Sequence, residues 1–116
     1  MTKDEYFISA LSSELFGEHF SQYKEWLTQP AEGNADPYGL ARKAMASLSE
    51  SQKMDIINFM KVVIADSASA LLGTLDGVHF PNDLEGDFAL TLDGEEIQGD
   101  LQSLFIDKAQ QEGAYG

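Results

Sequence analysis

Apolar residues recur every three or four positions along most of the first 77 residues, and this spacing predicts a series of helices. In the N-terminal segment the apolar positions are Phe7, Ile8, Leu11, Leu15, Phe16, Phe20, Tyr23 and Leu27. The spacing continues through Gly17, so one long helix kinked near Gly17 and two helices meeting there both fit; we favour the single helix. Pro30, Gly33 and Asn34 then predict a loop.

Helix starts are marked by side chains that accept hydrogen bonds from the free backbone N–H groups of the first turn, or by Pro, which has no N–H and loses no hydrogen bond there. Three such pairs occur: Thr2 with Glu5, Asp36 with Pro37, and Ser49 with Gln52. We expect the second helix to be short and to end near Leu48. The third helix should run to Leu75, where Asp76-Gly77 is typical of a helix stop.

The third predicted helix is apolar on most sides, since its first half leaves mainly Asp55, Asn58 and Lys61 for water. A helix of this kind is usually central in a domain, so its residues should be among the least exposed: Ile57, Met60, Ile64, Leu71 and Leu75. The small residues of its second half favour close approach by another element. The segment is long enough to span a membrane, but each charge inside it would cost about 2.5–3.5 kcal/mol. We therefore expect a buried helix of a soluble protein.

After Gly77 the pattern changes, first to an irregular connection and then to the strict alternation of a half-buried strand at 88–92. Asp93-Gly94 predicts a two-residue hairpin turn, with Leu92 opposite Glu95. The same register puts four side chains on the buried face: Phe88, Leu90, Leu92 and Ile97. Gly99-Asp100 should cap a last helix from 101 to about 112.

These elements predict a single domain over 1–116, with a helical part at 1–77 and an acidic loop, hairpin and closing helix at 78–116. The fold class is α+β and mainly helical: three or four N-terminal helices, then a β-hairpin, then a C-terminal helix. An isolated hairpin is marginal in water, so this one must lie on the helices or pair with another chain.

Charge is distributed unevenly along the chain, whose formal net charge is −13. Ten acidic residues and no Lys or Arg lie between Val62 and Asp107. A field of one sign repels nucleic acid and anionic membranes and attracts basic partners. The candidate partner-binding acidic patch comprises Asp83, Glu85, Asp87, Asp93, Glu95, Glu96 and Asp100.

Motifs for chemistry are missing from the sequence. There is no cysteine, no nucleophile elbow and no phosphate-binding glycine loop. EF-hand registers beginning at Asp76 or Asp83 both fail, which leaves only a looser cation site among Asp83, Glu85 and Asp87. The two histidines are His19 and His79. His19 could pair with Glu14 or Glu18 on a helix, but we interpret it as a half-exposed histidine of an amphipathic helix. The aromatic residues Tyr23, Trp26 and Tyr38 are either core residues under the first loop, which we favour, or a surface anchor of an interface.

The leading hypothesis is a small, acidic, soluble, non-enzymatic binding protein for a basic protein partner, of the inhibitor, immunity or accessory type. No cofactor, nucleic acid or membrane is expected, and the absence of cysteine and of a signal-peptide pattern favours the cytoplasm. The alternative is a homodimeric structural module whose acidity serves solubility, joined through the hairpin edge or the small-residue half of the third helix. A carboxylate- and histidine-based enzyme, or a cation-binding protein, is the third hypothesis.

Overall fold

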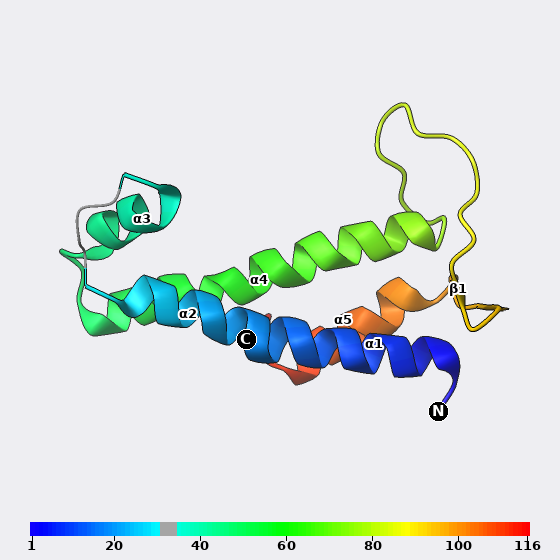
Figure 1. The fold of residues 1–116 in the computed structure, drawn as a ribbon, viewed down its shortest axis with the longest axis horizontal. Helices are drawn as coiled ribbons and strands as arrows, with labels where there is room; N and C mark the ends of the chain where they lie inside the picture. The colour runs from blue at the N-terminus through cyan, green and yellow to red at the C-terminus, as the bar shows by residue number, and fades with distance from the viewer. Residues whose placement is uncertain (31–34) are drawn as a thin grey trace.

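The N-terminal segment forms one continuous helix in three parts, as favoured from the sequence (Figure 1). The computed structural model describes residues 1–30 and 35–116, so the expected loop residues Gly33 and Asn34 lie outside the described residues. The three parts are α1 over Lys3–Ser13, a π-helical segment η1 over Glu14–His19, and α2 over Phe20–Thr28. A π-helical turn absorbs an extra residue within a helix. Gly17 lies in this turn, and the apolar face continues across it.

Two further helices begin at the predicted caps. They are α3 over Pro37–Met45 and α4 over Glu50–Leu75. The side chain of Asp36 accepts a hydrogen bond from the backbone N–H of Gly39 at 2.8 Å. Ser49 and Gln52 form a full capping box, with bonds of 3.1 and 3.0 Å. Both starts are therefore confirmed.

The capping box expected at Thr2 is wrong, although the helix does begin at Lys3. The Thr2 hydroxyl donates to the carboxylates of Asp4 and Glu5, and within the described residues it accepts no bond from the first helical turn. The carboxylate of Asp4, two residues after Thr2, competes for the hydroxyl proton, and the capping-box pattern does not consider it. The hydrogen bond that the Thr2 hydroxyl donates to Asp4 is the largest cause of the lowered pKa of Asp4.

The hairpin follows the predicted turn. Its strands are β1 over Thr91–Leu92 and β2 over Glu95–Glu96, paired antiparallel. Asp93 and Gly94 have φ of +51° and +78°, the positive values that a tight hairpin turn requires. Leu92 pairs with Glu95 as expected. The prediction fails at Phe88, which lies before the short strand and is 43% exposed, because residues 78–89 stand away from the helices.

The last helix, α5 over Leu101–Gln111, is capped by a residue distant in sequence. One carboxylate oxygen of Asp76 accepts from the N–H groups of Gly99 at 2.6 Å and Leu101 at 3.1 Å. The other oxygen accepts from Gln102 N–H at 2.8 Å. Asp100 was expected to cap α5, but within the described residues its side chain accepts no such bond. Asp76 ends α4, so this single carboxylate links the end of one helix to the start of another.

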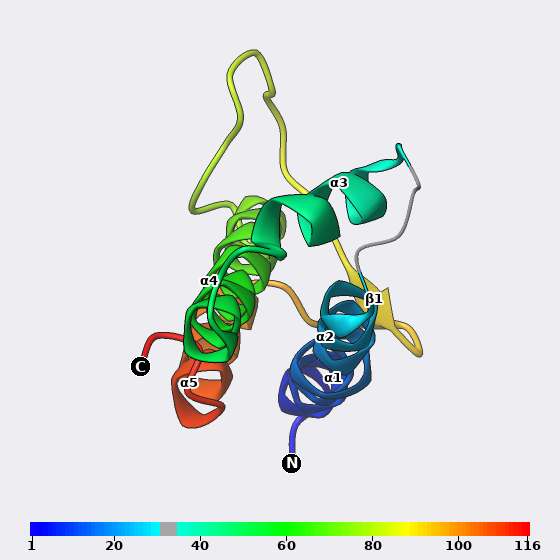
Figure 2. The same ribbon diagram turned by 90° about the vertical axis from the view of Figure 1, so that its left-hand side faces the viewer.

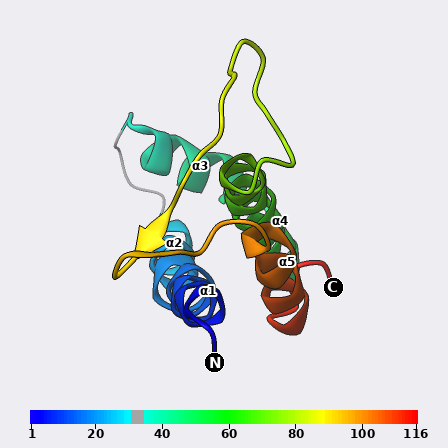
Figure 3. The same ribbon diagram turned by 90° about the vertical axis from the view of Figure 1, so that its right-hand side faces the viewer.

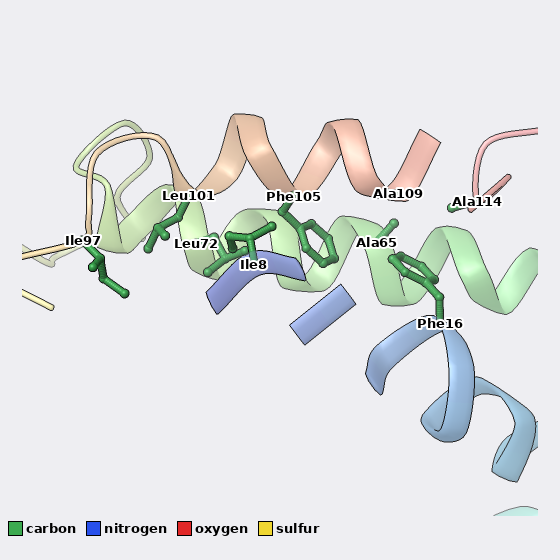
Figure 4. Close-up of a cluster of buried hydrophobic side chains, with 9 residues drawn as sticks. All are labelled: Ile8, Phe16, Ala65, Leu72, Ile97, Leu101, Phe105, Ala109 and Ala114. Carbon is green, nitrogen blue, oxygen red and sulfur yellow. The ribbon is translucent and has the colours of Figure 1, made fainter. Parts of the chain in front are cut away.

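The main core lies where α1, α4 and α5 meet, and Figures 2 and 3 show these helices nearly end-on. Its largest fully buried side chains include Ile8, Leu72 and Phe105, and the ring of Phe105 stacks on Phe16 at 5.8 Å between centroids (Figure 4). A Cβ added at Gly73 would lie only 2.5 Å from Gln102 Nε2. Ala65, Ser69 and Gly73 of α4 are buried on the side where α5 packs, and Gln102 Nε2 of α5 donates to the Ser69 carbonyl at 3.0 Å, so the small-residue half of α4 does contact another helix. The mainly helical α+β class is confirmed.

The prediction that α4 is central is wrong. Ile57 is fully buried, whereas Met60, Ile64 and Leu75 are only partly buried and Leu71 is 61% exposed. The helices α1, α2 and α5 cover one side of α4, and its opposite side faces solvent. Periodicity cannot identify the uncovered side of a helix that is apolar all round.

Candidate protein-binding surface

All seven residues of the predicted acidic patch are exposed. Asp83, Glu85 and Asp87 lie on the loop that follows α4, whereas the other four lie on the hairpin and at the start of α5. Figure 1 shows the loop, the hairpin and the start of α5 at the same end of the molecule, with the loop and hairpin as separate projections. Among the described residues, only Glu95 of the seven forms an ion pair, with Lys3 at 3.9 Å. Most of the negative charge is therefore free to act on solvent or on a partner.

Large apolar side chains are exposed on the same loop. Val78, Phe80, Leu84 and Phe88 are all exposed. Val78 and Phe80 precede the three acids of the loop, Leu84 lies between Asp83 and Glu85, and Phe88 follows Asp87. Scattered exposed apolar residues are normal, but grouped ones with a polar rim mark interaction sites. The loop therefore offers both apolar and acidic contacts.

The outer face of α4 is the second unusual surface. We define it by six exposed residues on the side of the helix opposite the core: Ile56, Phe59, Val63, Ser67, Ala70 and Leu71. Phe59 and Val63 are 63% and 52% exposed. By length and composition, α4 alone among the helices described is apolar enough to cross a membrane. A buried core helix would be mostly covered, but only 22% of the most apolar 18-residue stretch of α4 is buried. Helix α4 thus carries much more apolar surface than its neighbours cover.

Two hollows border the outer face. The first, of about 370 Å³, lies between α4 and the N-terminal helix and is lined by Leu15, His19, Tyr23, Met60, Val63, Ile64, Ser67 and Ala68. The second, of about 480 Å³, lies between the end of α4 and the acidic loop and is lined by Ala70, Leu71, Thr74, Leu75, His79, Pro81 and Phe88. Val63 and Ser67 of the outer face line the first hollow, and Ala70 and Leu71 line the second. The apolar face is therefore connected to the acidic loop through the second hollow.

The aromatic residues named from the sequence pack against one another. Tyr23 and Tyr38 stack with 6.4 Å between centroids, and Trp26 meets each of them edge-on at 5.5 and 5.2 Å. Tyr23 and Trp26 are half-buried and Tyr38 is 38% exposed, so the cluster is neither a deep core nor a free patch. It attaches α3 to α2, helped by a hydrogen bond from Arg42 Nη1 to the Trp26 carbonyl at 3.1 Å. Partial burial, followed by the contact with Tyr23, raises the pKa of Tyr38.

No metal-binding cluster appears in residues 1–30 and 35–116. That part of the chain contains no group of three His, Asp or Glu side chains that could hold a metal ion, so the looser cation site among Asp83, Glu85 and Asp87 gains no support. His19 and His79 are exposed. The ring of His19 meets Tyr23 edge-on at 5.1 Å between centroids.

Sequence reasoning found the acidic patch but missed the outer face of α4, because the apolar pattern was interpreted as burial. The available signal was the lack of enough predicted helices to surround α4. No family model matches the chain, and no curated protein or solved structure matches it either. The surface itself is therefore the only guide to function.

Proposed function

We propose that this is a small non-enzymatic binding protein whose acidic C-terminal surface meets a basic surface of a protein partner, as an inhibitor, immunity or accessory protein would. The observation that carries the proposal is the exposure of Phe80, Leu84 and Phe88 among the acids of the same loop. Acidity that served solubility alone would not require large apolar side chains beside the charges. A binding surface uses both, because apolar contacts supply affinity and charges supply orientation and rate.

Electrostatics favours a basic partner over other classes. No Lys or Arg lies between residues 62 and 107. Lys3 reaches the hairpin and pairs with Glu95, but acids outnumber it at this end of the molecule, so the field there is predominantly negative. Such a field raises the rate of encounter with an oppositely charged surface and suppresses encounter with nucleic acid or anionic lipid. We place the protein in the cytoplasm, in keeping with the absence of cysteine.

Affinity capture tests the proposal. The wild-type protein is used as bait in a lysate of its source at low and high salt, beside two variants. One variant reverses Glu85, Asp87, Glu95 and Glu96 to Lys; the matched control reverses the exposed acids Glu5, Glu25, Asp107 and Glu112. We expect a basic protein to be captured by the wild type and the control at low salt, and lost by the first variant. Equal loss from both variants would mean that only net charge matters, and would overturn the proposal.

A homodimeric structural module is the second candidate, favoured by the outer face of α4. The hairpin edge is a poor dimer contact, because each strand has only two residues. Light scattering after size exclusion distinguishes the candidates, since the module must be a dimer at micromolar concentration. The third hypothesis, a carboxylate- and histidine-based enzyme or a cation-binding protein, has no supporting feature among the described residues.

A further inference from the structure

We infer that the outer face of α4 docks one amphipathic helix of the basic partner, laid along α4 and ending over the acidic loop. This inference rests on the proposed function, and it adds the secondary structure and position of the segment that the partner contributes.

The spacing of the outer face points to a helix as its occupant. Its exposed positions 56, 59, 63, 67 and 70 follow one another at intervals of three or four residues. A straight stripe of this kind packs against another helix through interlocking side chains. The stripe covers about 20 Å at 1.5 Å per residue. A partner helix of about 14 residues matches that length, and one of about 18 residues also extends past the end of the stripe.

The middle and end of the stripe favour close packing. Ser67 and Ala70 are small and exposed, so a partner backbone can approach α4 there. Val63 and Leu71, on either side, are large enough to anchor it. Leu71 also lines the hollow beside Phe88, which gives a place for an apolar side chain of the partner helix.

The charges around the outer face of α4 indicate that the partner helix is positively charged. Asp55 and Asp66 are exposed on α4 itself, and the loop beyond its end carries three more exposed acids, Asp83, Glu85 and Asp87. The two lysines of α4 have partners, since Lys53 pairs with Glu50 at 3.3 Å and Lys61 lies over the Phe20 ring at 5.0 Å. A helix with one apolar face flanked by Lys or Arg complements this arrangement.

The exposed area of the molecule leaves room for such a partner. The accessible surface is 7609 Å², whereas a compact monomer of 12.7 kDa exposes about 6,200 Å². The radius of gyration of 17.2 Å likewise exceeds the roughly 13 Å of a compact domain of this length. A standard interface buries about 800 Å² on each partner. The excess surface is therefore large enough to be covered by a docked segment.

Two other occupants fit the charge less well. A second copy of this chain also carries a net charge of −13, so two copies repel each other as they approach. A lipid surface would receive the apolar stripe, but anionic headgroups would be repelled by the flanking acids.

The test uses a synthetic peptide as the probe. It is a fluorescein-labelled, end-blocked 18-residue peptide with Leu and Ala on one helical face and Lys and Arg on the other. A scrambled peptide of the same composition has the same net charge but no continuous apolar face when helical. Fluorescence anisotropy at about 0.15 M salt, where the Debye length is near 8 Å, gives the two dissociation constants. We expect the amphipathic peptide to bind at least about tenfold more tightly, since burial of several apolar side chains supports such a difference.

Variants place the peptide on the structure. Val63→Asn with Leu71→Asn should weaken binding of the amphipathic peptide about tenfold or more. The control is Tyr6→Asn with Leu40→Asn, which removes two exposed apolar side chains from α1 and α3 and should leave binding unchanged. All four positions are exposed, and circular dichroism confirms that the variants remain folded.

Four results would overturn the inference. The two peptides could bind with equal affinity, and reversal of Glu85, Asp87, Glu95 and Glu96 could abolish the binding of both. That result would support the proposed function but refute the inference that the partner segment is a helix. A dimer that Val63→Asn with Leu71→Asn converts to monomer would show that a second copy covers the face. Flotation with phosphatidylcholine vesicles, abolished by that same variant, would show that lipid covers it. Failure of both peptides to bind at any salt concentration would count against both proposals.

Discussion

Replacing Asp76 by Ala should destabilise the protein far more than its surface position suggests. Its carboxylate accepts three backbone hydrogen bonds, from Gly99, Leu101 and Gln102, and so satisfies the free N–H groups at the start of α5. Loss of an N-cap costs about 0.5–2 kcal/mol, and a hydrogen bond to a charged group contributes about 1.5–3 kcal/mol. The three bonds share one carboxylate and water can replace part of them, so we expect a loss of about 2–3 kcal/mol.

The assay is urea unfolding followed by circular dichroism, with thermal unfolding as a second measure. At roughly 4 °C per kcal/mol for a chain of this size, the melting temperature should fall by about 8–12 °C. Asp100→Ala is the matched control, because it removes the same charge one residue before α5 and, within the described residues, breaks no cap. It should cost less than about 0.5 kcal/mol. Equal losses for the two variants, or a negligible loss for Asp76→Ala, would refute the assignment of the cap.

Three further predictions concern the turn, the core and one tyrosine. Gly94→Val should lower the unfolding free energy by about 1–2 kcal/mol, because a β-branched residue resists the φ of +78°; a loss of zero in urea unfolding would contradict the turn. Ile57→Ala should cost about 2–5 kcal/mol, whereas Leu71→Ala should cost under about 0.5 kcal/mol, and the reverse order would contradict the described burial. The pKa of Tyr115 is raised by partial burial and then by the hydrogen bond from its hydroxyl to Asp66 at 3.1 Å. That contribution to stability is complete below about pH 10 and is lost as pH rises through the raised pKa, so Tyr115→Phe should flatten the alkaline fall of the unfolding free energy; identical slopes would be incompatible with this linkage.

Features that depend on neighbouring residues were predictable from the sequence. The turn at Asp93-Gly94 and its register follow from the positive φ that two adjacent residues accept. The caps at Asp36 and Ser49 likewise depend on side chains three residues or fewer from the groups they satisfy. Thr2 shows the limit of this local reasoning, because its hydroxyl has a choice of nearby acceptors.

Features that depend on distant partners were not predictable. The carboxylate of Asp76 reaches backbone groups 23 to 26 residues further along the chain, and no local pattern announces that contact. Leu71 and Phe88 were expected to be buried because they are apolar, but burial requires another element on the same side, and α4 and the loop lack one there. The acidic patch could be predicted from the charges in the sequence. The exposed outer face of α4 could be recognised only from the arrangement of the helices.

The most direct test of the central claim, that the acidic surface recruits a basic protein, is the salt dependence of the association rate. The captured partner is mixed with the wild type, the Glu85/Asp87/Glu95/Glu96 reversal variant and the Glu5/Glu25/Asp107/Glu112 control in a stopped-flow instrument. Screening shortens the Debye length from about 10 Å at 0.1 M to about 3 Å at 1 M. We predict that the first variant associates at least about tenfold more slowly than the control at low salt, and that this gap closes at high salt. Equal rates for the two variants at low salt would contradict the claim.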